Sequence, residues 1–356
     1  MGYDTLTGTE PARVALVVPL SGTLGMVGPC AINCAQLAAA ELNEARGVLD
    51  RPVELVLVDG GGEPATVASR VSTLVRDGTV DAIVGTHASD VRVALARAIG
   101  GLVPFVYTPP YEGGERTPGI YMAGEVPDRQ LRPALHWLVE THGARRWFLL
   151  GNDYVWPRRL HSAARNYLRA AGAEAVGQRY VRRGELDPQP LLDAIAAARA
   201  DAVLLTLIGS DLVAFNRAMA GTALAQRVVR LCAALEENGL LGAAGDDSGE
   251  LYASMGYFGA VTTDASLAFR ERYEARYGGH APVLNGHGEA CYGGLLLLGA
   301  LAARAGTFAP QAIDAVADGT TVLGGRGQLT VHRRHVSQPV YLARANGLEF
   351  EVLRSF

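Results

Sequence analysis

Apolar runs and amphipathic stretches alternate along the first third of the chain. The apolar runs cover residues 14–20, 53–59, 82–85 and 102–106, and the amphipathic stretches cover residues 29–45, 67–77 and 92–100. The apolar runs have the length of strands, and the stretches between them repeat apolar side chains at helical spacing. This alternation predicts a parallel sheet whose two faces are both covered by helices.

The same cycle restarts further along the chain. Expected helices cover residues 131–141, 157–171, 190–198 and 211–219, and expected strands cover residues 146–151, 175–180, 202–206 and 227–232. Two more helices are expected at 265–277 and 288–305. The last part, residues 327–352, alternates apolar and polar side chains and predicts a hairpin around Asn346-Gly347.

Two similar halves without a linker between them indicate an α/β protein with two doubly wound, Rossmann-like lobes. We expect residues 1–124 and 257–330 to form the first lobe, and residues 125–256 and 331–356 to form the second. The chain would then cross between the lobes three times, first within residues 122–128. Three crossing segments make a hinge, which suits closure around a ligand.

Composition narrows the class of protein. The 356 residues are 49% hydrophobic and 19% charged, which is typical of a folded globular chain. The formal net charge is −4, so the sequence shows no excess of positive charge that would indicate binding to nucleic acid or to an anionic membrane. The four cysteines have neither disulfide-framework nor zinc-ligand spacing. Residues 1–11 lack the basic and apolar regions of a secretory signal. Either the native protein is cytoplasmic, or a signal that directs it to the periplasm or to an extracellular lipoprotein was removed before this sequence begins.

Two aromatic loops are the strongest candidates for a binding site. Tyr107-Thr-Pro-Pro-Tyr-Glu-Gly113 and Gly151-Asn-Asp-Tyr-Val-Trp-Pro-Arg158 each follow an expected strand. Ligands of open α/β sheets bind at the loops that leave the carboxyl ends of the strands. We therefore expect Tyr107, Tyr111, Tyr154 and Trp156 to form pocket walls, and the alternative for Tyr154 and Trp156 is a role in packing.

Other loops add polar candidates. Ser21 lies in a loop with GxxGxxG spacing, which is neither a dinucleotide fingerprint nor a phosphate loop. His87 and Ser89 follow the third strand, where Ser89 could bind a ligand or cap the next helix. Further candidates are Ser210, Glu236 and Tyr257. The sequence has no GxSxG elbow, HExxH helix or carboxylate pair at ligand spacing, so we predict a binding protein with no cofactor and no bound metal.

The chain resembles the type I periplasmic-binding-protein fold family, which includes the Leu/Ile/Val-binding proteins. The resemblance covers nearly the whole length and is carried by Pro109–Gly113, Asp153–Arg158, Ala198–Val203 and Gly288–Tyr292. Within the family it is most similar to AmiC-type amide sensors. The amide pocket of those sensors corresponds to Ser89, Tyr107, Tyr154 and Trp156 of this chain, and Thr108 of the first aromatic loop is a further candidate binding residue. The chain departs from their pattern at His87, Pro109, Trp156 and Cys232–Leu235.

The resemblance implies a protein that closes its two lobes on a small polar ligand such as a short amide, urea or an amino acid. We expect an amide sensor whose partner is an RNA-binding antiterminator protein, with dimerisation left open. The alternative is the substrate-binding protein of an ABC importer, whose partner is a permease. An enzyme on the same fold is the least favoured hypothesis. An amino-acid ligand would need a carboxylate facing its ammonium group, and Glu236 or Glu237 could supply it.

Overall fold

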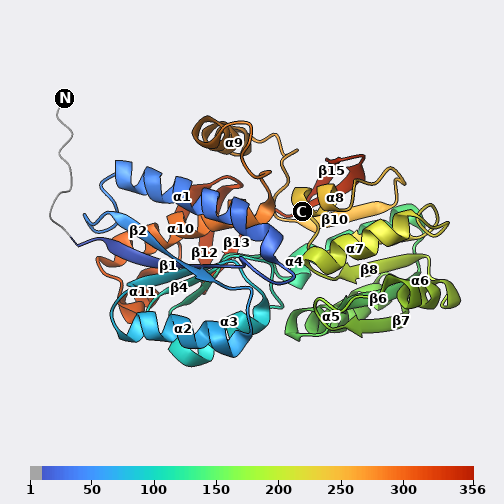
Figure 1. The fold of residues 1–356 in the computed structure, drawn as a ribbon, viewed down its shortest axis with the longest axis horizontal. Helices are drawn as coiled ribbons and strands as arrows, with labels where there is room; N and C mark the ends of the chain where they lie inside the picture. Colours follow the sequence, from blue (N-terminus) through green and yellow to red (C-terminus); the bar gives the residue numbers. More distant parts are fainter. Residues whose placement is uncertain (1–9) are drawn as a thin grey trace.

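The computed structural model describes residues 10–356, which form two α/β lobes side by side (Figure 1). Residues 1–9, the start of the expected first lobe, lie outside the described part. The sheet of the first lobe contains β1 (Ala12–Val18), β2 (Val53–Asp59), β3 (Ala82–Gly85), β4 (Phe105–Tyr107), β5 (Ile120–Met122), β11 (Thr321–Gly324), β12 (Gly327–His332) and β13 (His335–Ser337). Its helices are η1 (Gly25–Val27), α1 (Gly28–Glu44), α2 (Pro64–Arg76), α3 (Ser89–Ile99), α9 (Asp264–Tyr277), α10 (Gly286–Ala305) and α11 (Pro310–Val316).

The second lobe repeats the arrangement. Its sheet contains β6 (Arg146–Asn152), β7 (Glu174–Val181), β8 (Ala202–Thr206), β9 (Val229–Cys232), β10 (Leu251–Met255), β14 (Tyr341–Asn346) and β15 (Glu349–Ser355). Its helices are α4 (Pro127–His142), α5 (Val155–Ala170), α6 (Pro188–Ala197), α7 (Gly209–Ala220) and α8 (Glu237–Gly242).

The two sheets share one strand order. The parallel part of the first runs β2-β1-β3-β4-β5 and that of the second runs β7-β6-β8-β9-β10. Strands from the C-terminal part of the chain complete one edge of each sheet: β13 joins β5 in parallel and is followed by the antiparallel strands β12 and β11, and β14 and β15 join the second sheet antiparallel. This confirms the predicted fold class. The order reverses direction between β1 and β3, and between β6 and β8, so a crevice is expected at these points, above the carboxyl ends of the strands.

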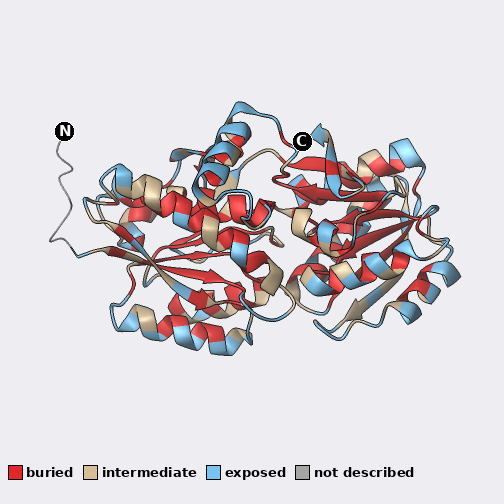
Figure 2. Cartoon of the chain, turned by 45° about the horizontal axis from the view of Figure 1, so that its top comes forward, coloured by how far each residue is buried: buried red, intermediate tan, exposed pale blue. Residues whose placement is uncertain are grey.

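The central strands of both sheets are buried on both faces, whereas the edge strands β2 and β7 are partly exposed (Figure 2). In β1, Val14, Leu16 and Val18 pack against α1 and α10, while Ala15 and Val17 pack against α2 and α3. Successive side chains of a strand point to opposite faces, so a strand between two helical layers needs apolar residues at every position. The second lobe follows the same rule with α6 and α7 on one face and α4 and α5 on the other.

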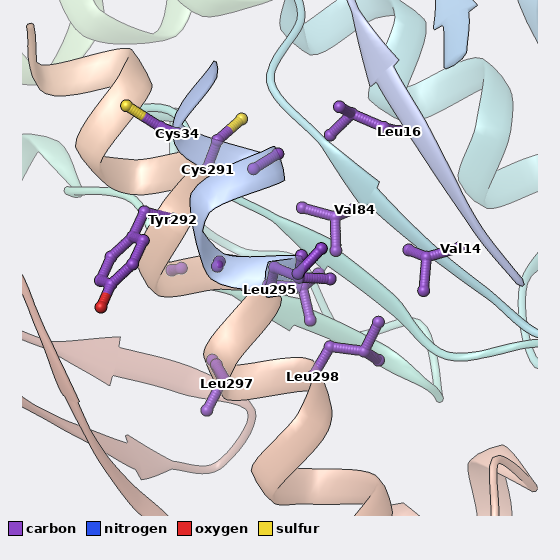
Figure 3. Packing of buried hydrophobic residues seen from close by; sticks show 14 of the residues in the cluster. Val14, Leu16, Cys34, Val84, Cys291, Tyr292, Leu295, Leu297 and Leu298 are labelled. Carbon is purple, nitrogen blue, oxygen red and sulfur yellow. The ribbon is translucent and has the colours of Figure 1, made fainter. Parts of the chain in front are cut away.

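Helix α10 forms the centre of the first lobe. Of its labelled leucines, Leu295 and Leu298 point toward the side of Val84 and Val14 of the sheet, and Cys291 lies near Cys34 of α1 (Figure 3). All four cysteines are buried and free, so they serve as small apolar residues. Among the described residues no single helix is both long and apolar enough to cross a membrane. The pair α10 and α11 reaches the required length and composition only with a 90° bend between them.

One expected boundary is wrong. We predicted that the chain returns to the second lobe after residue 330, but that position lies inside β12, and both β12 and β13 belong to the first sheet. The last crossover therefore falls between Ser337 and Tyr341. The other two crossovers lie between β5 and α4 and after β10.

Candidate functional site

A cavity lies between the lobes, where the carboxyl ends of both sheets face each other. Loops after β1, β3 and β4 form its first-lobe wall, and loops after β6, β8 and β9 form its second-lobe wall. The lining residues are Leu24, Met26, Val27, His87, Ala88, Ser89, Tyr107, Pro109, Pro110, Tyr154, Trp156, Ile208, Gly209, Leu212, Ala234, Glu236, Asn238, Gly239 and His287. Most of these side chains are apolar or aromatic, as is usual for small-molecule pockets.

The two walls stand close together. The open volume between them is about 40 Å³. Hydrogen bonds cross the gap from the backbone N–H of Ser210 to the carbonyl of Thr23 (2.9 Å) and from the side chain of Asn238 to the carbonyl of Met26 (3.2 Å). Arg183 of the second lobe also pairs with Asp90 of the first. The lobes are therefore in a closed arrangement.

Aromatic side chains from both predicted loops meet in this cavity. Tyr107 ends β4, and its hydroxyl donates to the carbonyl of His87 (2.7 Å), which fixes the direction of the ring. Tyr154 is the residue before α5, and its ring is covered by the guanidinium of Arg183 at 4.9 Å. Trp156, in the first turn of α5, is 3% exposed and lies 6.3 Å from Tyr154 between ring centres. The three rings give the cavity a rigid apolar surface.

Seven of the twelve predicted site residues line the cavity: His87, Ser89, Tyr107, Pro109, Tyr154, Trp156 and Glu236. Ser89 is the first residue of α3, and no side chain caps that helix, so the structure does not support the possible capping role of Ser89. Burial lowers the pKa of His87 to about 4, against a smaller opposing effect of its contact with the carbonyl of Ala88. His87 is therefore a neutral imidazole in the wall.

Tyr111 does not face the cavity. Its hydroxyl bonds to Nδ1 of His335 (2.6 Å), and the guanidinium of Arg92 lies 5.5 Å from its ring centre. The neighbouring Glu112 pairs with the same guanidinium at 2.5 Å. These bonds turn the second half of the loop toward a separate cavity, which the first and third crossovers line. The predicted pocket role of Tyr111 therefore finds no geometric support.

Four other predicted residues also lie outside the cavity. Thr108 is buried beneath it, where its hydroxyl bonds to Thr86 and to the carbonyl of Gly85. Tyr257 packs edge-on against Phe269 in the first-lobe core. Ser21 donates to Asp59 (2.6 Å), and Ser210 is exposed at the rim, where its backbone joins the interlobe contact. Each lies in a loop that the sequence places correctly, but hydrogen bonding or packing directs the side chain elsewhere.

The charged part of the cavity is a pair of residues from opposite lobes. Glu236 precedes α8 in the second lobe, and His287 is the second residue of α10 in the first. Nδ1 of His287 lies 2.6 Å from Oε1 of Glu236, and the backbone N–H of His287 donates to the same oxygen (2.8 Å). The ring N–H is poorly aligned with that oxygen, so the side-chain contact is an ion pair more than a hydrogen bond.

The pair makes stability depend on pH. Burial alone would lower the pKa of His287, but the carboxylates of Glu236 and, more weakly, Glu125 raise it above the ordinary value of about 6.5. A raised folded-state pKa stabilises the fold fully below about pH 6.5, and this contribution is lost as pH rises through the raised value. Arg326 is a further charged residue near His287, and both line a small neighbouring cavity together with Glu125.

We expect His287→Gln to lower the unfolding temperature more at about pH 6 than at about pH 9. Thermal unfolding of wild type and variant at both values measures this difference. His280→Gln, at an exposed histidine, is the matched control and should show the same small change at both. An equal effect of His287→Gln at the two values would contradict the ion pair.

Sequence reasoning missed several lining residues. Three of them, Leu24, Met26 and Val27, follow Ser21 in the loop after β1. In the sequence they resemble an ordinary apolar turn before a helix. Asn238 and His287 were also missed. The run Asn285-Gly-His-Gly does indicate a possible site. Asn285 is a typical residue for capping α10, and the backbone N–H groups of a first helical turn, including that of His287, have no partner within the helix. Nothing in the sequence pairs that histidine with Glu236.

The chain is similar to known proteins over nearly its whole length. The chain matches the family described as periplasmic binding protein over residues 11–349, and it belongs to that family. Its fold is that of the Leu/Ile/Val-binding-protein-like type I periplasmic binding proteins. The finer resemblance to amide sensors stays a prediction.

Solved structures share the fold at low sequence identity. One is a solute-binding protein of an ABC transporter from R. palustris in complex with 4-hydroxybenzoate, with 19% identity, a TM-score of 0.86 and coverage of 98% of this chain and 97% of that chain. Another is the branched-chain amino acid transporter substrate-binding protein of Streptococcus pneumoniae in complex with isoleucine. It has 19% identity and a TM-score of 0.84, and the match covers 97% of this chain and 99% of that chain. A third is a leucine-binding protein from Thermotoga maritima. It has 19% identity and a TM-score of 0.83, and the match covers 97% of this chain and 98% of that chain.

Proposed function

We propose that this protein is the solute-binding receptor of an ABC importer and that it closes on a small molecule with an apolar body and a polar end. The observation that carries the proposal is the interlobe cavity, with rings from both lobes on its walls and one ion pair on its floor. A ligand that contacts both lobes favours the closed form by its difference in affinity for the two forms.

The transport role has more support than the amide-sensor role predicted from the sequence. Proteins of the same fold include substrate-binding proteins of transporters in complex with 4-hydroxybenzoate and with isoleucine, and a leucine-binding protein. The departures at His87, Pro109 and Trp156 lie on the cavity wall, where an amide pocket would have kept its pattern. The proposed partner is accordingly an ABC permease. This role places the protein outside the cytoplasmic membrane, and no catalytic step is part of it.

A thermal-shift screen tests the proposal. The library holds benzoates, branched aliphatic carboxylates, branched-chain and aromatic amino acids, short amides and urea. A ligand at about 100 times its dissociation constant stabilises the folded form by about 2.7 kcal/mol, which is a clear shift in unfolding temperature. We expect at least one class to give it. A library without any active compound would contradict the proposed function, and activity of short amides and urea alone would favour the sensor role.

A further inference from the structure

Glu236 is the only carboxylate among the described residues that line the cavity. Its side chain is 2% exposed, and it belongs to the loop between β9 and α8 of the second lobe. A ligand ammonium group in this cavity would need this carboxylate as its partner, since a buried charge is stable only when it is paired. Whether Glu236 is free for a ligand therefore decides which charges the cavity accepts.

The protein already supplies a cation to Glu236. The imidazole and the backbone N–H of His287 both contact Oε1, at 2.6 and 2.8 Å. The backbone contact uses an N–H of the first turn of α10, which has no partner within its own helix. Gly286 lies against the same oxygen, so the main chain of α10 approaches Glu236 closely. Two independent contacts thus hold His287 on the carboxylate.

This pairing changes the charge that a ligand meets. An imidazolium and a carboxylate in contact leave the cavity floor without net charge, and a ligand ammonium beside them would face the like charge of His287. His287 also lines the cavity, and its Nε2 bonds to no residue within the described part of the chain. That nitrogen is left to donate to an anionic or carbonyl oxygen of a ligand.

We infer that the cavity selects small carboxylates with an apolar body and no ammonium group over α-amino acids of the same carbon skeleton. This inference rests on the proposed function and specifies its substrate class. The apolar body would lie among Tyr107, Tyr154 and Trp156, and the carboxylate would lie toward His287. The imidazole of His287 is then the specificity determinant, because it occupies the place that a ligand ammonium would take.

Calorimetry on two matched pairs of compounds tests the inference. The pairs are L-leucine with 4-methylpentanoate, and L-phenylalanine with 3-phenylpropanoate, whose members differ only by the amino group. We expect the carboxylate of at least one pair to bind at least tenfold tighter than its amino acid. Tighter binding of the amino acids overturns the inference and leaves the proposed function intact. Binding of only amides or urea also overturns it, and a library without any ligand overturns both.

Two variants separate a role in specificity from a role in folding. His287→Ala frees Glu236 and should move the ratio of amino-acid to carboxylate affinity at least tenfold toward the amino acid. Glu236→Gln removes the carboxylate and should not produce this gain. His280→Ala is the control at an exposed histidine. An unchanged ratio in folded His287→Ala overturns the inference, and if that variant does not fold, the wild-type comparison still decides it.

Discussion

Replacing Gly209 by alanine should weaken solute binding at least tenfold while the protein stays folded. Gly209 begins α7 at the carboxyl end of β8, with φ +51°, and it faces the loop after β1 across the cavity. A Cβ at this position would overlap the carbonyl oxygen of Thr23 in the other lobe. That same carbonyl accepts the interlobe hydrogen bond from Ser210. The added methyl group therefore clashes with Thr23 in the closed form, and this clash is absent when the lobes are apart.

A matched glycine separates closure from backbone strain. Gly143 follows α4 with φ +64°, and a Cβ there would meet nothing within 4 Å. Alanine at either position carries a left-handed backbone cost of about 1–2 kcal/mol, so both variants should lose similar stability. Only Gly209→Ala should lose affinity, measured by calorimetry with a ligand from the screen. Equal affinities of the two variants would contradict closure through this contact.

Replacing Arg326 by methionine should destabilise the fold by about 3–5 kcal/mol near pH 8.5, because it leaves buried carboxylates unpaired. Arg326 lies between β11 and β12 and is 6% exposed. Its guanidinium lies 2.6 Å from Glu125 on the first crossover and donates to the carbonyl of Pro339 on the third (2.7 Å). Its backbone N–H donates to Glu289 (3.2 Å). One side chain thus joins two of the three hinge segments.

The loss should depend on pH. Burial raises the pKa of Glu289 to about 7 even though Arg326 lowers it, so its pKa should rise further without the guanidinium. At about pH 5.5 the carboxylate of Glu289 takes up a proton, and a protonated carboxyl group is far less costly to bury. The difference in unfolding free energy between wild type and Arg326→Met should therefore shrink on acidification. Urea unfolding at both values measures it.

A surface arginine provides the control for Arg326. Arg344 pairs with Glu351 at 2.7 Å, and both side chains are more than a third exposed. Arg344→Met should cost no more than about 1 kcal/mol, as is usual for exposed pairs. Glu125→Gln in the Arg326→Met background should recover part of the lost stability, since it removes one unpaired charge. A loss for Arg326→Met as small as that for Arg344→Met would contradict the hinge role.

The sequence predicts this fold well where one strand sits between two helical layers. Residues 14–18 are apolar at every position because both faces of β1 are covered, and few other structures require that pattern. Short strands were missed for the opposite reason. Residues of β5 (Ile120–Met122) are too few to show a period, and β13 meets β5 through a single residue pair, His335 and Met122. The misplaced boundary at residue 330 follows from that missing strand pairing.

The candidate site was predictable at the level of loops and less so at the level of side chains. A loop after a strand must lie at the sheet edge, so Tyr107, Tyr154 and Trp156 reach the cavity by topology alone. Tyr111 turns away because its partner, His335, lies 224 residues further along the chain. Glu236 and His287 are 51 residues apart and meet only when the lobes come together. No local pattern encodes such contacts.

Tryptophan fluorescence tests most directly whether a solute binds between the lobes. The chain has three tryptophans, and of these Trp156 alone lines the cavity. A non-absorbing ligand from the screen should change the emission of the wild type and of Trp137→Phe, whose half-buried ring packs beside His142 away from the cavity. The same ligand should leave the emission of Trp156→Phe unchanged, even at a concentration that calorimetry shows to be saturating. A full emission change in Trp156→Phe would contradict binding in the interlobe cavity.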